Sequence, residues 1–195
     1  MRGIEQRPLL YDAGMALLER TGLGRWREWL AGGTPEGRVL DLGCGTGRNL
    51  PLFPRAARVV GVDPCRETLR KAARRAPGVP LVCARAEALP FRDGVFDTVV
   101  SGLVFCSVSD PARGLAESGR VLRAGGRLRM LEHVRAEGRL ASWLQDRAQP
   151  AWTWLTGGCH PNRETEAAVA AAGFVIDPET RRASGDMRRF EARRP

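Results

Sequence analysis

Glycine occupies every second position in part of the stretch RVLDLGCGTGRNLPLF, which covers residues 38–53. An apolar run ends in Asp41, and Gly43, Gly45 and Gly47 follow. Glycine lets a turn bend tightly and lets a ligand touch the main chain, because no side chain stands in the way. In open α/β sheets, ligands bind at the carboxyl ends of strands where the strand order reverses. The stretch therefore predicts a strand that ends in a ligand-binding loop.

The spacing of the glycines differs from that of a dinucleotide-binding loop. A dinucleotide fingerprint, G-x-G-x-x-G counted from Gly43, needs its third glycine at position 48, which is Arg48 here. A second acid, Asp63, ends the next apolar run, 22 residues after Asp41. A carboxylate at that place suits the hydroxyls of a ribose. Two structural roles compete with these assignments: Asp41 orienting the loop, and Asp63 capping a helix ahead of Pro64.

Short apolar segments alternate with helical ones through the first two thirds of the chain. The expected strands are rich in Val or Leu and bounded by Gly, Pro or Asp; they cover residues 38–42, 58–63, 80–84, 96–101 and 127–132. The expected helices cover residues 47–52, 66–75 and 111–122, with a turn near Leu89. This alternation predicts an α/β fold, with a parallel sheet and helices on both faces.

Local signals mark several boundaries. Asp110 is placed to cap the helix that Pro111 begins, and RAGG at residues 123–126 ends it. An amphipathic helical segment covers residues 9–30, with weak points at Gly22 and Gly24. After residue 135 the alternation stops. Periodicity does not resolve the tryptophan-containing insert at about 138–161; a helix at 163–171 and two strands joined by a turn follow it.

Length and composition narrow the class of protein. The 195 residues are enough for one domain, 1–195, and too few for two ordinary ones. The net charge is +9, but the basic residues are scattered, and Lys71 is the only lysine, so we expect no nucleic-acid partner. No apolar run is long enough to span a bilayer, and the start is not typical of a signal peptide. We expect a cytoplasmic protein.

The cysteines indicate neither disulfides nor a metal. There are five, an odd number, at wide spacing. No CxxC pair and no paired Cys/His spacing occurs, so the sequence predicts no disulfide framework and no structural zinc. Buried, reduced thiols are the expectation for all five.

The pattern from Asp41 to Gly47 resembles motif I of the class I S-adenosylmethionine (SAM)-dependent methyltransferases. The segments GVFDTVVS and VLRAGGRLRMLE resemble the fourth and fifth strands of that family. The resemblance implies a Rossmann-like, doubly wound sheet of about seven strands, mostly parallel with the last antiparallel. It also implies SAM as cofactor and S-adenosylhomocysteine as product.

The same resemblance assigns the cofactor contacts. Asp41 reaches the methionine end of SAM, and Ser101 lies beside the transferred methyl group. The remaining expected contacts are the loop Gly43, Cys44, Gly45, Thr46 and Gly47, then Asp63 and Pro64 at the ribose, and Ala86 and Glu87 at the adenine.

Further segments resemble the small type-11 methyltransferases, which include membrane-associated thiol S-methyltransferases of animals and bacterial phospholipid N-methyltransferases. They are YDAGMALLERTGLGRWREWL, FCSVSDPARGLAESGRVLRAGG, MLEHV and GGCHPNRETE. The animal thiol enzymes begin with a hydrophobic membrane segment that this sequence lacks. We therefore expect a small-molecule acceptor, most simply an apolar or aromatic thiol, with peripheral membrane contact as a further option.

Methyl transfer from a sulfonium needs alignment of the reacting atoms, exclusion of water and a reactive nucleophile. A free thiol has a pKa of about 8.5, so a base would help near neutral pH. His133, after the fifth strand, is the expected catalytic residue; a surface or structural imidazole is the alternative. The expected acceptor contacts are Tyr11, Phe105, Cys106, Trp154 and His160. Trp143, Trp152 and Trp154 form a lid, a membrane-surface patch or ordinary packing.

Two other functions stay open at this point. One is N- or C-methylation of an amine, a phospholipid headgroup or a quinone precursor. The other is a protein that is not an enzyme, either a SAM-binding regulator or a basic nucleic-acid binder on the same fold.

Overall fold

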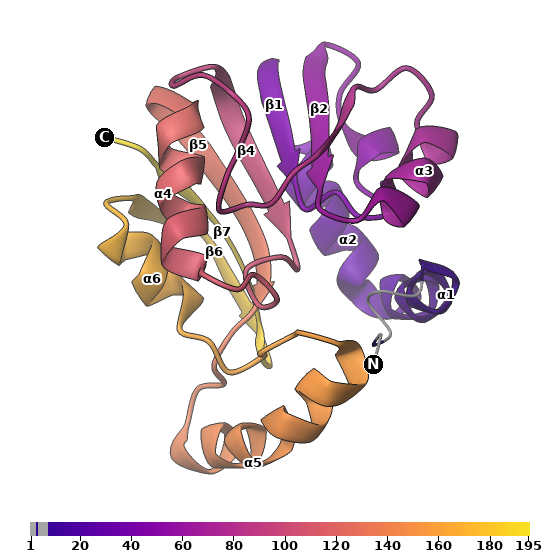
Figure 1. The fold of residues 1–195 in the computed structure, drawn as a ribbon. Coiled ribbons are helices and arrows are strands. Elements are labelled where there is room, and N and C mark those ends of the chain that lie inside the picture. The colour runs from indigo at the N-terminus through magenta and orange to yellow at the C-terminus, as the bar shows by residue number, and fades with distance from the viewer. Residues whose placement is uncertain (1–2, 4–7) are drawn as a thin grey trace.

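One seven-stranded sheet forms the centre of the molecule in the computed structural model, which describes residue 3 and residues 8–195 (Figure 1). For Pro8, Leu10, Tyr11, Leu18 and Thr21 only the backbone is described. The strands are β1 (Gly37–Leu42), β2 (Ala57–Asp63), β3 (Leu81–Cys83), β4 (Phe96–Gly102), β5 (Leu122–His133), β6 (Val175–Ser184) and β7 (Met187–Arg193). Their order is β3-β2-β1-β4-β5-β7-β6. The first five are parallel and β7 is antiparallel to both neighbours, which confirms the expected doubly wound sheet.

The strand order reverses at β1, which pairs with β2 on one side and with β4 on the other. The carboxyl ends of β1, β2, β4 and β5 therefore meet along one edge of the sheet. Neighbouring strands lie about 4.8 Å apart, so the ends of β1 and β5, with β4 between them, are roughly 10 Å apart. This edge is where the fold brings separate loops together.

Helices cover both faces of the sheet, so its central strands are buried on both sides. On one face, α4 (Pro111–Val121) and α6 (Thr165–Ala171) lie over a cluster that includes Leu40 and Leu115. The other face carries α3 (Arg66–Arg75) and an N-terminal segment, over a cluster that includes Val39 and Leu30. That segment consists of α1 (Pro8–Leu18), η2 (Glu19–Leu23), α2 (Gly24–Arg27) and η3 (Glu28–Gly32). Adjacent residues of β1 thus pack against opposite layers, as in other parallel sheets.

The local signals at α4 are confirmed. The Asp110 carboxylate accepts a hydrogen bond from Arg113 N at 3.0 Å, and Pro111 is the first helical residue. The helix ends at Val121, and β5 begins immediately at Leu122, five residues earlier than expected. The segment RAGG therefore ends the helix, as expected, but belongs to the strand.

Two expectations about helices were wrong. Residues 47–52 form only a 3₁₀ turn, η4 (Leu50–Leu52), because Pro51 and the positive φ of Gly47 (80°) disfavour an α-helix. The helical segment 9–30 is not continuous, because Gly22 adopts a φ of 121° inside η2. The weak point anticipated at Gly22 is the point where the helix breaks.

The insert that periodicity left unresolved is a helix, α5 (Arg139–Thr156), with Pro150 inside it. Figure 1 shows α5 beyond the carboxyl ends of the strands, away from the body of the sheet. Several large apolar side chains of this helix are exposed: Leu140, Trp143, Leu144, Trp152, Trp154 and Leu155. The helix therefore lies beyond the core of the domain and leaves much of its apolar surface uncovered.

Candidate active site

The three glycines of the loop after β1 all have positive φ, but for different reasons. A β-carbon at Gly43 would lie 2.4 Å from a methyl group of Val104, and one at Gly47 would lie 2.9 Å from Ala72. Both positions are closed by packing. At Gly45 the nearest atom would be 4.0 Å away, so this position alone faces open space. The expected close approach of a ligand to the main chain therefore applies to Gly45.

Asp41, the last acid of β1, is completely buried below this loop. Its Oδ1 accepts a hydrogen bond from Asn49 Nδ2 at 2.9 Å, and Arg27 Nη1 donates to Asn49 Oδ1 at 2.6 Å. No described residue bonds to its Oδ2, and burial raises the pKa of Asp41 to about 7. A buried carboxylate oxygen without a hydrogen-bond partner is costly in free energy. A cationic ligand at the loop, such as the ammonium of SAM, would supply that partner, so these residues fit the cofactor.

Asp63, at the end of β2, holds the loop in place. Its Oδ2 accepts from Gly45 N at 3.0 Å, and its Oδ1 accepts from Cys65 N at 2.9 Å and Thr68 Oγ1 at 2.7 Å. These bonds tie the glycine loop to the start of α3. Asp63 is half-buried at the same edge of the sheet, so its assignment to the ribose stays a proposal beside this structural role.

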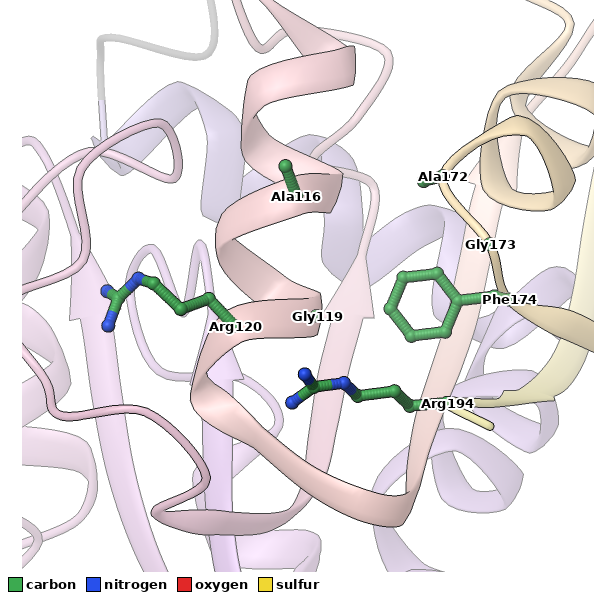
Figure 2. Close-up of a pocket in the computed structure, with 7 residues that line it drawn as sticks. All are labelled: Ala116, Gly119, Arg120, Ala172, Gly173, Phe174 and Arg194. Atoms are coloured by element: carbon green, nitrogen blue, oxygen red, sulfur yellow. The ribbon is translucent and has the colours of Figure 1, made fainter.

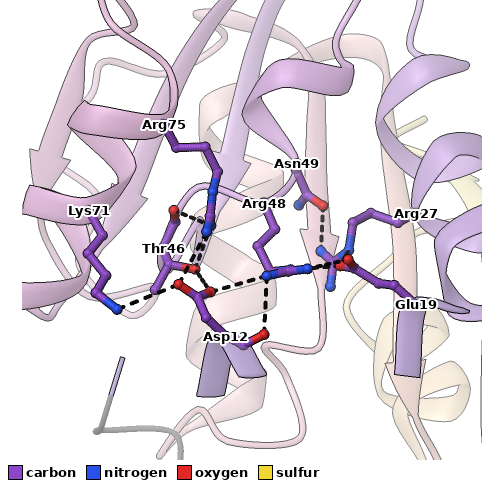
Figure 3. Close-up of polar contacts among 8 residues, drawn as sticks. All are labelled: Asp12, Glu19, Arg27, Thr46, Arg48, Asn49, Lys71 and Arg75. Atoms are coloured by element: carbon purple, nitrogen blue, oxygen red, sulfur yellow. Dashed lines mark hydrogen bonds and ion pairs between the residues drawn. The ribbon is translucent and has the colours of Figure 1, made fainter. Parts of the chain in front are cut away.

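Charged side chains of the N-terminal segment close over the loop, a contact that sequence reasoning missed (Figure 3). Thr46 Oγ1 donates to Asp12 Oδ1 at 2.7 Å, and Arg48 pairs with both Asp12 and Glu19. The other members of this network are Arg27, Lys71 and Arg75. Several of the pairs join residues about 30 positions apart, a separation at which no periodic pattern exists.

A second buried acid, Glu132 in β5, fixes the loop after β4. Its Oε1 accepts hydrogen bonds from Ser101 Oγ at 2.8 Å, Val104 N at 3.1 Å and Phe105 N at 3.2 Å. Burial raises the pKa of Glu132. The structure thus places the Ser101 hydroxyl in the interior, on Glu132. Glu132 was not among the predicted site residues, although an acid inside an apolar strand was the available signal.

Cys106, His133 and Cys159 come together at the carboxyl ends of β4 and β5. Their side-chain ligand atoms all lie within 4.8 Å of one another, and His133 Nδ1 is 3.8 Å from Cys159 Sγ. The contact with Cys106 and the nearby His133 lower the pKa of Cys159 to about 5, against the effect of burial. Burial lowers the pKa of His133, but its contacts with Cys159 outweigh this and raise it. The cluster joins two expected site residues to Cys159, which was not expected.

The remaining predicted residues lie as follows. Cys44 is a buried thiol whose pKa burial raises, which fits a small filler, and Pro64 is exposed beside Asp63. Ala86 is buried in the turn after β3, and Glu87 Oε1 accepts from Arg85 Nη2 at 3.2 Å and Asp110 N at 3.3 Å. The assignment of both to the adenine stays a prediction.

The expected acceptor contacts separate in the structure. Phe105 packs into the core, 3.1 Å from where a β-carbon at Gly114 would lie. His160 lies beside the cluster, with Nδ1 2.8 Å from Gln149 Nε2. The Trp154 side chain is 69% exposed on α5, whereas Trp152 makes an edge-on contact with His133, at 6.5 Å between ring centres. The side chain of Tyr11 lies outside the described residues.

A hollow of about 310 Å³ elsewhere on the surface is not part of this site (Figure 2). It lies between the end of α4 and the segment after α6, and its lining includes Arg120, Phe174 and Arg194. Because β5 begins just after α4, the hollow is near the amino ends of the strands. Ligands of doubly wound sheets bind at the opposite edge.

A doubly wound sheet of this order, with a glycine loop and a buried acid at the reversal point, defines a class I SAM-dependent methyltransferase. Residues 40–130 match the family described as a methyltransferase domain, of type 11. The chain is 35% identical over 176 residues to human thiol S-methyltransferase TMT1A, covering 85% of this chain and 71% of that protein. It is 36% identical over 113 residues to phosphatidylethanolamine N-methyltransferase of Cereibacter sphaeroides, covering 54% of this chain and 56% of that protein.

A solved structure shows the same fold. A SAM-dependent methyltransferase of Thermotoga maritima, a possible histamine N-methyltransferase, superimposes with a TM-score of 0.74 at 24% identity, covering 98% of both chains. The chain belongs to the type-11 family of SAM-dependent methyltransferases. It is an enzyme that uses SAM. Among the described residues, no helix is long and apolar enough to cross a membrane.

Asp41→Asn should weaken SAM binding and stabilise the protein in the absence of SAM. The native pKa of Asp41 is about 7, against about 3.9 unfolded, so between those values only the folded state holds the proton. Stability therefore falls as pH rises through that range, by about 4 kcal/mol in all. The asparagine side chain carries no charge, so it does not cause this loss, but it leaves one buried N–H without a partner. We therefore expect the free energy of unfolding to rise by about 1–3 kcal/mol at pH 8 and by less at pH 5.

Thermal unfolding at pH 5 and pH 8 and calorimetric titration with SAM measure the two effects. Loss of the charged hydrogen bond should lower SAM affinity about tenfold or more. Unchanged affinity would mean that the Asp41 carboxylate only orients the loop.

Proposed function

We propose that the enzyme methylates the sulfur of a small apolar or aromatic thiol. The observation that carries this proposal is the cluster of Cys106, His133 and Cys159 at the end of β5, roughly 10 Å from the end of β1. The human relative that covers most of the chain is named a thiol S-methyltransferase, which supports the same acceptor.

The cofactor side of the site is the edge between β1 and β2. The Asp41 carboxylate receives the ammonium, the main chain at Gly45 lies along the ligand, and Asp63 accepts from the ribose. When bound, SAM supplies a methyl group on a positively charged sulfur. The protein holds the loop still through the bonds of Asp63 and the charged network of Asp12 and Arg48.

The acceptor side is the edge between β4 and β5. A thiol attacks a methyl group far faster as its thiolate, and a free thiol is mostly protonated at neutral pH. His133, the proposed catalytic residue, ends β5 at this edge, and we assign to it the ionisation of the acceptor sulfur. Cys106 and Cys159 are buried, His133 is half-buried, and the ring of Trp152 lies edge-on against His133. This burial limits water at the cluster and strengthens charge interactions there. The catalytic effect that we assign to the chain is to favour the thiolate form of the acceptor over the protonated thiol, next to the methyl group.

A second acceptor class is favoured by the surface of α5. Its outward apolar side chains, Trp143, Trp154 and Leu140 among them, accompany Arg147, which lies over the Trp143 ring at 4.8 Å. Aromatic and basic side chains of this kind suit a membrane surface. A lipid headgroup amine is therefore the second candidate acceptor, as in the relative from Cereibacter sphaeroides.

A screen with methyl-labelled SAM tests the proposal. The acceptors are aliphatic and aromatic thiols, amines, demethylated quinones and phosphatidylethanolamine vesicles. We expect label in the thiols, with the largest kcat/KM for apolar ones. Label in the vesicles or quinones but in no thiol would replace the proposal by the alternative, and SAM binding without any turnover would indicate a regulator.

We infer a cytoplasmic location as well. Its support is that the five cysteines, all within the described residues, form no disulfide.

A further inference from the structure

The cluster of Cys106, His133 and Cys159 has the donor set of a metal site. Two thiol sulfurs and one imidazole nitrogen lie within 4.8 Å of one another, from three separate segments. Cys106 follows β4, His133 is the last residue of β5, and Cys159 follows α5. Both cysteines are buried, with exposed fractions of 1% and 2%, and His133 is half-buried.

The distances suit a tetrahedral ion. Zinc binds sulfur at about 2.3 Å and imidazole nitrogen at about 2.0–2.1 Å, which places tetrahedral ligand atoms about 3.5–3.8 Å apart. The His133 Nδ1 to Cys159 Sγ distance is 3.8 Å. All three ligand atoms lie within 4.8 Å of one another, so no pair is more than about 1 Å beyond the range for tetrahedral zinc.

The backbone around the cluster is held in place by hydrogen bonds. His160 N donates to Cys106 O at 2.7 Å, which joins the loop after β4 to the segment after α5. Thr153 Oγ1 donates to Cys159 O at 2.7 Å, and Cys159 N donates to Thr156 Oγ1 at 3.2 Å. Ligands held in this way lose little freedom on binding a metal.

We propose that Cys106, His133 and Cys159 bind one zinc ion and leave its fourth position open. Two thiolates balance the charge of Zn²⁺, so the buried site is neutral once loaded. Three protein ligands, two Cys and one His, with an open position are the pattern of catalytic zinc, whereas structural zinc has four. Thiolate and imidazole ligands favour zinc over magnesium or calcium.

The role of the open position rests on the proposed function. An acceptor thiol that binds there releases its proton to solvent, because a coordinated thiol is deprotonated. A lone pair of its sulfur forms the new S–C bond to the methyl group. The bond from that methyl group to the SAM sulfonium breaks, and its electron pair stays on the leaving sulfur. The products are a thioether and S-adenosylhomocysteine, with the proton in solution and the metal unchanged.

Metal content and cobalt substitution test the site. Purified enzyme, incubated with zinc under reducing conditions and desalted, should retain one zinc per chain. The cobalt(II) form should show sulfur-to-metal charge transfer and the intense visible bands of tetrahedral cobalt, and an added acceptor thiol should change them. Retention of no metal would overturn the proposal, as would cobalt bands without charge transfer or an oxidised Cys106–Cys159 pair under these conditions.

Variants assign the ligands. Cys106→Ser and Cys159→Ser should each lower zinc affinity on the order of 100-fold or more, since even changes outside the ligand set cost 10–100-fold. Cys83→Ser, at an exposed cysteine of β3, is the matched control and should bind zinc normally. Circular dichroism and SAM titration establish that each variant is folded. Equal zinc affinity in all three variants would overturn the assignment.

These measurements do not depend on turnover. Zinc bound at Cys106 and Cys159 without thiol methylation would remove the proposed function and leave the metal site. Thiol methylation by an enzyme that binds no zinc would remove the metal site and leave the proposed function.

Discussion

Gly45→Val is expected to abolish SAM binding while the protein stays folded. A β-carbon at Gly45 would lie no closer than 4.0 Å to any described atom, so the valine side chain would extend into the open space where we expect the ligand. Overpacking costs about 1–3 kcal/mol even where a site can adjust, and a rigid loop adjusts little. We expect the SAM affinity, measured by calorimetry, to fall at least about 100-fold.

The substitution also strains the backbone, so it needs a matched control. Gly45 has a φ of 53°, which disfavours a branched residue. Gly125 has a φ of 69°, has open space around it and lies at the amino end of β5, far from the loop. Gly125→Val should lower the melting temperature by a similar amount and bind SAM normally. If both variants bind SAM, or both lose it, the approach of the ligand to Gly45 is wrong.

His133→Phe should lower the rate of methyl transfer by roughly 10²–10⁴, the range typical for a group that helps to ionise a nucleophile. The loss should shrink at high pH, because an acceptor thiol with a pKa of about 8.5 then ionises unaided. SAM affinity should change little, since His133 ends β5 and the cofactor loop follows β1.

Single-turnover rates from pH 6 to 10, for both proteins, measure this effect. A loss of the same size at every pH would show that His133 positions the acceptor instead of ionising it. A variant as fast as the original enzyme would exclude His133 from the chemistry. The SAM affinity of the variant, measured in parallel, reports whether the site is intact.

The sequence by itself determined the fold and the edge of the sheet at which the candidate cofactor residues meet. Strand and helix identity follow from patterns a few residues long, such as the buried run that ends in Asp41 or the Asp110–Pro111 start of α4. Parallel strands then force their carboxyl ends to one edge, so Asp41, Gly45 and Asp63 had to meet. The hairpin of β6 and β7 was predicted as two strands joined by a turn, and the family resemblance implied that the last strand of the sheet is antiparallel.

Tertiary structure decided which glycine of the loop faces open space and which side chains meet at the candidate site. All three loop glycines look alike in sequence, but Val104 and Ala72 close two of the positions and leave Gly45 open. Packing alone turns Ser101 toward Glu132, leaves Trp143 and Trp154 of α5 exposed, and brings Cys159 to His133 across 26 residues of chain. A side chain's partners depend on how layers pack, and residues so far apart share no local period that a sequence pattern can display.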